Sequence, residues 1–419
     1  MKKIIFTEFF TTISYSHFLK SLKFITINLF LLKKGKSVVE FENTLLDYLW
    51  LDNSKILSFY NWRSALFNAF KIIWIKKNDE IIVNWYNCIS VINSIIQSKA
   101  IPIYCDISKF NFWLDIKDLE NKITKKTKII IIQHTFWKSS KINEIISLAN
   151  KHNILVIEDC AHSLWSEYNW KKHWTFWDFS LFSTWRDKVI SWVNGGFLVI
   201  NNNKFNKKYK KIITKLTVPN IGLLFKNHLY NIFWFISFKT YTFLSFWKAL
   251  IFTTRKLWLF NEVLTDDEKK CKNKELNLIL PNSLAALALS DFWNIEKDIN
   301  HRRVLYEYYY ENINNNLFKV PFFENKNEFN NSFRVPLLFE NNMIKDKVFK
   351  YMSKQWIILG YSWSSSTIAP LGSSLKNAKY TKCKKSEDIS SRLLLLPNHK
   401  YITIDDAKFI TDLLNNFKV

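Results

Sequence analysis

Short apolar runs and amphipathic stretches alternate along the first half of the chain. The apolar runs are rich in β-branched residues and predict strands at residues 56–59, 80–83, 101–105, 128–133 and 155–158. The stretches between them carry apolar residues three and four positions apart and predict helices at residues 64–73, 90–98 and 141–152. Strands that alternate with helices of about ten residues are typical of a doubly wound, mainly parallel α/β sheet.

Further elements are predicted before and after these residues, and those toward the C-terminus form a second domain. A helix is expected at residues 38–50, strands at 179–183 and 196–200, and a long helix from Pro281 to about Asn312. The residues after this helix alternate short strands and helices, which is typical of a smaller α+β domain. We therefore expect a large domain over residues 35–280 and a small C-terminal domain over residues 281–419.

One segment departs from this alternation. Residues 221–260 are aromatic and apolar, with five basic residues spaced through them, and they look like an insertion in the large domain. Their longest uncharged run, 227–238, has 12 residues, whereas a membrane-spanning helix needs about 20. Two interpretations stay open. The segment is a helical hairpin packed on the protein or on a dimer partner, or it is an amphipathic element at a membrane surface with its lysines among the lipid headgroups.

The composition narrows the class of protein. The chain has 419 residues, of which 48% are hydrophobic and 23% charged, enough for one large core and a second, smaller one. Five scattered cysteines without a C-x-x-C pair argue against a zinc ribbon or a disulfide framework and fit a reducing compartment. The net charge is +24, but the lysines are spread along the chain without an arginine-rich helix or a nucleic-acid-binding motif. We therefore expect no nucleic-acid partner.

Glycine and tryptophan depart most from ordinary composition. The chain has 6 glycines and 18 tryptophans, whereas average usage would give about 29 glycines. Tryptophan stands where turns would need glycine: it follows asparagine at 61–62, 84–85 and 169–170, and six tryptophans fall within residues 165–192. We therefore hypothesise that many of the tryptophan codons are UGA, in a genome that reads UGA as glycine. A genuinely tryptophan-rich surface is the alternative.

The most specific group of polar residues follows a predicted buried strand. Asp159 comes at the carboxyl end of the strand at 155–158, with His162 just after it. Lys188 lies 29 positions after Asp159, between the strand at 179–183 and an Asn-Gly-Gly turn at 194–196. The carboxyl ends of parallel strands are where α/β sheets bind ligands. These residues are therefore the candidate site.

In this order, and with tryptophan taken as glycine, the motifs resemble those of the DegT/DnrJ/EryC1/StrS sugar aminotransferases, which are fold-type I pyridoxal-phosphate enzymes. The matched motifs are EDxAHxxG, a glycine-rich GD turn, and FSxxxxK followed by GG. The resemblance implies that Lys188 binds the cofactor covalently and moves a proton. It also implies that Asp159 pairs with the pyridine nitrogen, that His162 lies near the cofactor ring, and that Ser183 binds the phosphate.

A turn further upstream resembles the family's phosphate-binding turn. Trp62, Arg63 and Ser64 match S-G-T-x-A-L, in which a glycine lets backbone N–H groups at a helix N-terminus approach the cofactor phosphate. A tryptophan side chain at position 62 would fill the space that the phosphate needs. The resemblance nevertheless implies that Trp62, Arg63 and Ser64 stand at the cofactor-binding positions of this turn.

Two further matches are incomplete. Tyr86 and Cys88 lie at the strand end whose last residue, an aromatic one in the family, stacks on the cofactor; with Cys88 there, stacking weakens or passes to Tyr86. Asn277 matches the asparagine of a G-Y-N-x-R loop that reaches across the family dimer. The arginine position of that loop is Ile279 here, and Arg186 is the candidate substitute.

The resemblance implies an enzyme that uses pyridoxal 5'-phosphate to convert a nucleotide-linked keto-sugar to an amino sugar for a surface polysaccharide. Glutamate is the expected amino donor, a homodimer the expected assembly, and no metal is expected. Since family dehydratases carry histidine at the lysine position, Lys188 favours amino transfer. A pyridoxal-phosphate sugar dehydratase and a catalytically inactive membrane-surface scaffold are the alternatives. The expected location is cytoplasmic, with a peripheral position at the inner face of the membrane if segment 221–260 binds lipid.

Overall fold

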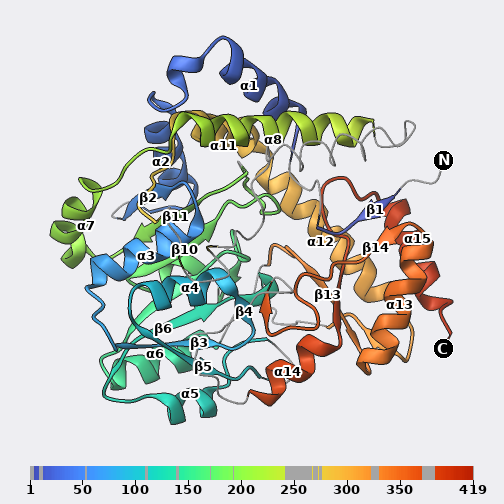
Figure 1. Ribbon diagram of the computed structural model, residues 1–419. Helices are drawn as coiled ribbons and strands as arrows, with labels where there is room; N and C mark the ends of the chain where they lie inside the picture. Colours follow the sequence, from blue (N-terminus) through green and yellow to red (C-terminus); the bar gives the residue numbers. More distant parts are fainter. Residues whose placement is uncertain are drawn as a thin grey trace. The chain divides into compact units, whose positions relative to one another are not determined.

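The computed structural model describes residues 4–8, 13–51, 54–108, 112–137, 141–169, 171–191, 193–240, 267, 272, 276–321, 330–369 and 383–418 (Figure 1). Contacts divide the chain into two units. The first comprises residues 10–73 and 181–296, and the second residues 2–9, 74–180 and 297–419. The largest sheet among the described residues has seven strands. The predicted domain boundary between residues 280 and 281 stays a prediction.

In the first unit, two buried strands pair antiparallel: β2 (Lys55–Phe59) and β11 (Gly196–Ile200). Their register sets Gly196 opposite Phe59. Among the described residues, the helices of this unit are α1 (Tyr15–Thr26), α2 (Ser37–Tyr48), α3 (Trp62–Ile73), α7 (Asn206–Ile213), α8 (Ile221–Lys239) and α11 (Asn282–Asp291). Helices α2 and α3 and both strands confirm the elements predicted there.

Helices α1 and α8 begin at side-chain caps. The hydroxyl of Ser14 accepts a hydrogen bond from the backbone N–H of His17 at 3.2 Å, before α1. The carboxamide oxygen of Asn220 accepts one from the backbone N–H of Leu223 at 2.8 Å, before α8. Such caps satisfy N–H groups that have no partner within the helix, so they define where each helix starts.

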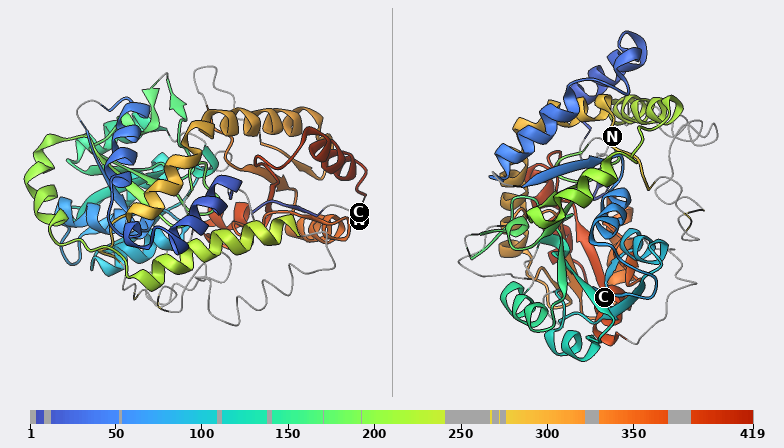
Figure 2. Two further views of the ribbon diagram at one scale, coloured as in Figure 1. Left: turned by 90° about the horizontal axis from the view of Figure 1, so that it is seen from above. Right: turned by 90° about the vertical axis from the view of Figure 1, so that its left-hand side faces the viewer.

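Helix α8 forms the first part of segment 221–260 and packs against α1. The two helices lie side by side in both Figure 1 and Figure 2. Buried Ser21 of α1 lies 3.2 Å from His228 Nδ1 and accepts a hydrogen bond from Asn231 Nδ2 at 3.1 Å. The rings of Phe18 and Phe235 stack with centroids 4.8 Å apart. Residues 241–260 of the segment lie outside the described residues.

The predicted helix from Pro281 to Asn312 is interrupted. Helix α11 ends at Asp291, a 3₁₀ turn spans Phe292–Asn294, and α12 (Ile295–Asn312) follows. The ring of Phe292 is buried against Tyr48, with ring centroids 5.0 Å apart, and against Phe41 at 6.5 Å. This packing on α2 accounts for the break, because the tighter turn directs Phe292 into the core.

In the second unit, four strands form a parallel sheet in the order β7-β6-β3-β5. They are β3 (Glu80–Asn84), β5 (Ile101–Cys105), β6 (Thr127–Gln133) and β7 (Leu155–Asp159). The helices between them are α4 (Ile89–Gln97), α5 (Ile116–Lys122) and α6 (Ile142–Lys151). Fully buried isoleucines such as Ile82, Ile130 and Ile132 fill the core at this sheet. The predicted mainly parallel α/β architecture is confirmed.

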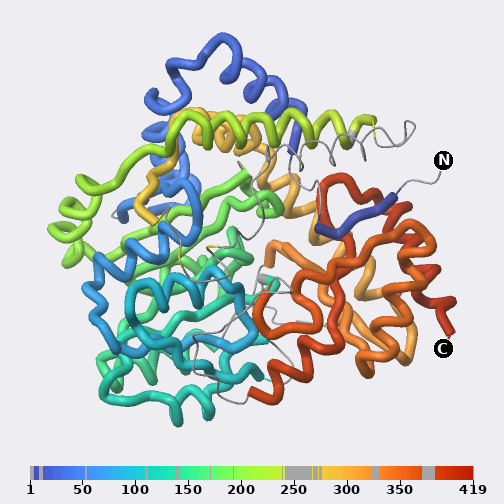
Figure 3. The backbone as a smooth tube through the Cα atoms, in the orientation of Figure 1, coloured from blue at the N-terminus to red at the C-terminus, as the bar shows by residue number. Residues whose placement is uncertain are grey.

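The later part of the second unit is an α+β arrangement. Its three-stranded antiparallel sheet has the order β12-β13-β16, with β12 (Phe318–Lys319), β13 (Val335–Phe339) and β16 (Leu393–Leu396). Its remaining helices are α13 (Asn342–Lys354), α14 (Lys384–Ser391) and α15 (Ile404–Asn415). The N-terminal strand β1 (Ile5–Phe6) pairs in parallel with β14 (Ile357–Ile358). In Figure 3 the blue N-terminal segment lies beside the orange and red segments of the C-terminal part.

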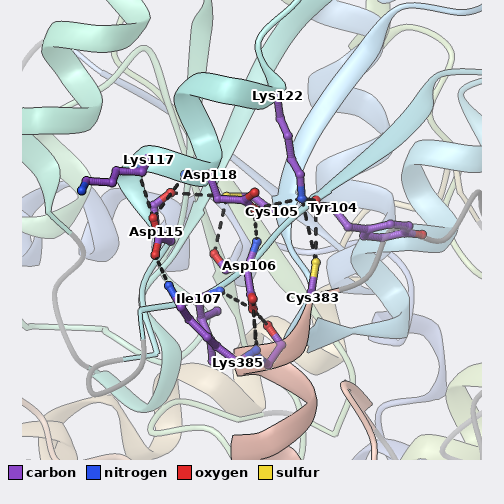
Figure 4. A network of polar contacts seen from close by, with 11 residues as sticks. Tyr104, Cys105, Asp106, Ile107, Asp115, Lys117, Asp118, Lys122, Cys383 and Lys385 are labelled. Atoms are coloured by element: carbon purple, nitrogen blue, oxygen red, sulfur yellow. Dashed lines mark hydrogen bonds and ion pairs between the residues drawn. The ribbon is translucent and has the colours of Figure 1, made fainter.

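Helix α14 takes its N-terminal cap from a residue far away in sequence. Its own cap residue, Cys383, makes no side-chain capping bond. Instead, the carboxylate of Asp106, directly after β5, accepts hydrogen bonds from the backbone N–H groups of Lys385 at 3.0 Å and Ser386 at 2.9 Å. The Lys385 ammonium also donates to Asp115 (Figure 4). These bonds attach α14 to the end of a core strand. No helix within the described ranges is long and apolar enough to cross a membrane.

Candidate active site

Strand β10 (Phe179–Ser183) leads into the loop that carries Lys188. In this loop the backbone N–H of Thr184 donates to the Gly195 carbonyl at 3.1 Å, and that of Lys188 donates to the Trp185 carbonyl at 2.9 Å. The loop therefore folds back on itself, and Lys188 is only 9% exposed. Burial and the closed loop restrict the Lys188 side chain, as suits a lysine that binds a cofactor covalently.

The glycine pair after this loop is required by the backbone. Gly195 has a φ of 146°, which side chains disfavour. A Cβ atom at Gly196 would lie 2.7 Å from the carbonyl oxygen of Phe182 and 2.8 Å from the Cα of Trp62. Strand β11 and the first turn of α3 thus approach each other closely. Ser183, at the end of β10, accepts a hydrogen bond on its hydroxyl from the Trp185 N–H at 3.4 Å.

The predicted phosphate turn forms the capped N-terminus of α3. The carboxamide oxygen of Asn61 accepts hydrogen bonds from the backbone N–H of Ser64 at 2.8 Å and from its hydroxyl at 3.0 Å. Both donors of Ser64 therefore bond within the turn. Trp62 and Arg63 are partly exposed, and they occupy the positive end of the helix, where an anion is stabilised.

A buried polar group beside this turn was not anticipated from the sequence. The carboxamide of Asn194 donates to the Tyr60 hydroxyl at 3.1 Å and to the Asn227 carboxamide oxygen at 3.0 Å. Asn227 in turn donates to the Tyr60 hydroxyl at 2.8 Å. The guanidinium of Arg186 lies 4.2 Å from the centre of the Tyr230 ring. Helix α8 thus contacts both ends of the lysine loop, a role that its composition did not indicate.

Asn277 contacts residues of the first unit. Its carboxamide oxygen accepts a hydrogen bond from the Lys71 ammonium at 2.7 Å, and its carbonyl accepts one from the Thr217 N–H at 2.9 Å. Ile279, which replaces the family arginine, forms a β-bridge with Phe59 at the end of β2. The loop is thus joined to the strand that precedes the phosphate turn.

In the second unit, Asp159 ends the parallel strand β7. It is 4% exposed, and its Oδ1 accepts a hydrogen bond from the backbone N–H of Ala161 at 3.0 Å. Its carbonyl accepts one from the N–H of His134 at 3.3 Å. The register of β6 and β7 sets Gln133 opposite Asp159, at the carboxyl edge predicted for the site. A buried carboxylate in this place suits a cationic partner.

His162 lies among aromatic rings. Its Nδ1 accepts a hydrogen bond from the backbone N–H of Phe136 at 3.3 Å, and the two rings are nearly parallel, at 8°. The rings of Phe333 and Trp363 lie with their centroids 4.9 Å and 5.2 Å from that of His162. The imidazole is therefore held in one orientation by packing and by a hydrogen bond, as a residue that contacts a planar cofactor must be.

Tyr86 belongs to the same aromatic group and is fully buried. Its hydroxyl donates to the carbonyl of Trp363 at 2.6 Å, and burial raises the pKa of Tyr86 well above its ordinary value. Cys88, half-buried, precedes helix α4, and its backbone N–H donates to the Asn87 side chain at 2.7 Å. The contacts of Tyr86 are those of a core residue.

A second buried polar group includes Glu158, the neighbour of Asp159 in strand β7. His134 and Glu158 are fully buried, with Nε2 and Oε1 2.9 Å apart. Burial lowers the pKa of His134 to about 3 and raises that of Glu158 well above its ordinary value. Both shifts favour the uncharged forms, between which the contact is a hydrogen bond. The His173 ring stacks on His134 at 3.9 Å, and Cys160 has its sulfur near the pair. Of these residues, only Glu158 and Cys160 fall within the EDxAHxxG motif.

The residues present fit pyridoxal 5'-phosphate in their chemistry. The first unit supplies a buried amine, Lys188, and the N-terminus of α3, where Gly196 allows close backbone approach. The second unit supplies the buried carboxylate of Asp159 and the oriented imidazole of His162. An amine for the aldehyde, a carboxylate for the pyridinium, a flat ring and an anion site are the groups that this cofactor needs.

Comparison with known proteins agrees with this chemistry. The model of the DegT/DnrJ/EryC1/StrS aminotransferase family matches residues 17–223 and 259–415. Since this is most of the chain, the protein belongs to the DegT/DnrJ/EryC1/StrS aminotransferase family.

Individual relatives match part of the chain. The GDP-perosamine synthase of Escherichia coli O157:H7 is 34% identical over 169 residues, and that of Vibrio cholerae is 31% identical over 170 residues. These alignments cover 40% and 41% of this chain and 46% of each relative. The chain thus spans about half the length of the curated relatives it matches.

The fold extends further than this sequence similarity. The structure of the putative sugar aminotransferase Spr1654 from Streptococcus pneumoniae, in its PLP form, has a TM-score of 0.75 with 16% identity. It covers 99% of this chain and 98% of that chain. At this identity the likeness shows the fold, and it confirms the fold-type I architecture expected from the motifs.

Proposed function

We propose that this protein is a pyridoxal-phosphate-dependent aminotransferase that converts a nucleotide-linked keto-sugar to an amino sugar. Family membership and the fold support the class of reaction. The observation that carries the proposal is the buried Lys188 in the closed loop between β10 and the required glycine pair. Histidine at this position would favour a dehydratase, so the lysine favours amino transfer.

Each site residue then has a defined task. When bound, the cofactor supplies an electron sink for the carbon that gains or loses the amino group. The Lys188 amine anchors the cofactor and moves a proton at the reacting carbon. The Asp159 carboxylate holds a proton on the pyridine nitrogen, and His162 packs against the ring.

The cofactor phosphate is assigned to residues of the first unit. Ser183 and the turn Trp62, Arg63 and Ser64 would bind it at the N-terminus of α3. Because Ser64 bonds to Asn61, its hydroxyl would have to turn away from Asn61 to reach the phosphate. Tyr86, Cys88 and Asn277 complete the proposed set, Tyr86 through the packing that orients His162 and Asn277 through the loop beside β2.

The substrate class rests on the relatives. Both relatives compared above are named GDP-perosamine synthases, which supports a nucleotide-linked keto-sugar as amino acceptor for this chain. Glutamate as amino donor is what the resemblance to the family implies. The product would be an amino sugar for a surface polysaccharide.

The direct test is to load the purified protein with pyridoxal 5'-phosphate, add glutamate and screen nucleotide-linked keto-sugars. Mass spectrometry should show the gain of an amino group with release of 2-oxoglutarate. Loss of water without nitrogen gain would make the dehydratase the better assignment. Neither product with any sugar, from a protein that binds the cofactor, would favour the inactive scaffold.

Partners and location form a finer part of the proposal. We propose that the protein forms a homodimer, because family sites use both chains. We also propose that it is cytoplasmic and contacts the inner face of the membrane through segment 221–260. Exposed Ile221 of α8, and exposed Leu19 and Leu22 of α1, the helix against which α8 packs, support an apolar contact, with lysines for anionic lipid. Flotation with anionic and neutral liposomes, of the whole protein and of a form lacking 221–260, tests it. If neither form floats at low salt, the segment is a packing element only.

A further inference from the structure

Four tryptophans adopt a backbone conformation that tryptophan rarely takes. Trp50, Trp74, Trp165 and Trp356 have φ values of 55°, 72°, 68° and 66°. Among the described residues, 13 non-glycine residues have positive φ, and tryptophan is the most frequent of them, ahead of asparagine with three. The left-handed region brings Cβ close to the backbone, so bulky side chains avoid it and glycine is its usual occupant.

The setting of Trp50 is that of a helix-ending glycine. The N–H of Trp50 donates to the Asp47 carbonyl at 3.2 Å, and the N–H of Leu51 donates to the Leu46 carbonyl at 3.0 Å. This pair of bonds defines the Schellman motif, whose left-handed position is usually glycine and sometimes asparagine. Asn153 occupies that position after α6. Tryptophan has neither glycine's freedom nor the short polar side chain of asparagine.

Two other helices end at a tryptophan in the same conformation. Trp74 follows α3 directly, and Trp356 follows the cap residue of α13, with its N–H bonded to the Ser353 carbonyl at 3.1 Å. Trp50, Trp74 and Trp356 are 70%, 63% and 48% exposed. Their indoles gain little burial to offset the backbone strain, so packing does not explain why tryptophan stands there.

At position 62, glycine is favoured for a different reason. It begins α3, with its Cα where a Cβ on Gly196 would be only 2.8 Å away. Its indole Nε1 is buried and has no hydrogen-bond partner among the described residues. A buried donor without an acceptor costs stability, and a helix N-terminus that binds an anion needs its N–H groups uncovered.

We infer that the protein made in its own cell carries glycine at positions 50, 62, 74, 165 and 356, where the sequence has tryptophan. Six glycines among 419 residues are too few for the turns that the fold contains, and 18 tryptophans are in excess. One reassigned codon, UGA decoded as glycine, accounts for the deficit, the excess and the left-handed backbone together.

The residue at position 62 should also affect cofactor binding, an expectation that rests on the proposed function. Glycine at position 62 would expose the first N–H groups of α3 to the cofactor phosphate, so the form with tryptophan should bind cofactor poorly. This part can fail while the codon inference stands, because the residue at position 62 is determined without any activity measurement.

The decisive experiment sequences the gene and identifies peptides of the protein isolated from its own cells by mass spectrometry. UGA at the five codons together with glycine in the five peptides is the expected result. UGG at these codons, or tryptophan in the peptides, would overturn the inference.

A stability measurement gives an independent outcome on recombinant protein. Trp50→Gly and Trp356→Gly should each raise the denaturant midpoint, because glycine relieves the left-handed strain. Trp50→Ala removes the same indole without that relief and should not raise it. Trp293→Gly is the matched control, because Trp293 is 85% exposed within the 3₁₀ turn and its φ is not positive; it should lower the midpoint. Equal lowering by all the glycine variants would contradict the conformational argument.

Discussion

The backbone N–H of Phe136 and the Nδ1 atom of His162 are joined by a hydrogen bond of 3.3 Å. Since Nδ1 accepts, a neutral imidazole carries its proton on Nε2. Phe136 itself has a φ of 56°, uncommon for an aromatic residue and of the kind of strain found at functional sites. The bond and the parallel rings fix the plane of the imidazole before any cofactor arrives.

The ring of His162, rather than its proton, should govern cofactor binding. His162→Ala is expected to weaken pyridoxal-phosphate affinity about tenfold, as loss of one aromatic contact worth about 1 kcal/mol or slightly more implies. His162→Phe keeps a flat ring and should lose less affinity, although it leaves the Phe136 N–H without its acceptor. Cofactor titration followed by fluorescence measures both. Equal losses in the two variants would show that ring stacking is not the role.

Lys188→Ala should abolish amino transfer while the protein still folds, because the cofactor loses its covalent anchor and the reaction its proton carrier. Borohydride reduction and peptide mapping of the loaded parent protein should place the cofactor on Lys188. Lys172 is the internal control, since it is buried to a similar extent, 8% against 9%, but pairs with Glu167. Label on Lys172 or on another lysine would refute the assignment.

Asp159→Asn should bind the cofactor but turn over about 10²-fold more slowly, because an amide cannot keep the pyridine nitrogen protonated. Asparagine retains the oxygen that accepts from the Ala161 N–H, so the fold should persist. Single-turnover absorbance of the bound cofactor measures the chemical step. Asp79→Asn serves as the control, because Asp79 is partly exposed and its carboxylate accepts a hydrogen bond from the backbone N–H of Lys76, outside the candidate site. Turnover of Asp159→Asn close to that of the control would contradict the role.

The buried His134 should make stability depend on pH below neutrality. Burial lowers its pKa in the folded protein to about 3, whereas an unfolded histidine titrates near 6.5. As the pH falls below about 6.5, the unfolded state binds a proton that the folded state does not bind. The free energy of unfolding should therefore fall by up to about 1.4 kcal/mol per pH unit for this group.

Urea unfolding between pH 8 and pH 5 tests this. His134→Gln keeps a donor for Glu158 and should reduce the slope by about one proton. His152→Gln, at an exposed position after α6, is the matched control for the loss of a histidine. His173 and His228, also buried with lowered pKa values, account for the slope that remains. An unchanged slope in His134→Gln would mean that His134 is protonated when folded.

Asp106→Ala should destabilise the protein by about 1–3 kcal/mol, because two N–H groups of α14 and the Ser386 hydroxyl lose their acceptor. The effect should be local. Hydrogen exchange should show faster exchange at Lys385 and Ser386 while the core strands stay protected. Asp106→Asn keeps one acceptor oxygen and should cost less. Protection of α14 equal to that of the parent protein would show that the cap is not what holds the helix.

The sequence alone determined the elements whose cause is local. Alternating apolar runs and amphipathic stretches predicted β2, β3, β5, β6 and β7 and the helices α3, α4 and α6, because periodicity reflects which face of an element is buried. The short helix α5 between β5 and β6 was not predicted. The motif order predicted that Asp159 ends a buried strand and that Lys188 precedes a glycine turn. The shortage of glycine also showed at this level, since composition needs no coordinates.

The tertiary structure decided what depends on residues far apart in the chain. Asp106 caps a helix about 280 residues later, and Tyr60 joins Asn194 and Asn227 in a buried group. The helix predicted as continuous breaks where the ring of Phe292 packs against Phe41 and Tyr48 of α2. Helix α8, ambiguous by composition, packs against α1 through Ser21. Such contacts form only when folding has brought distant segments together, and buried polar groups must then find partners wherever the chain places them. Local periodicity cannot specify them.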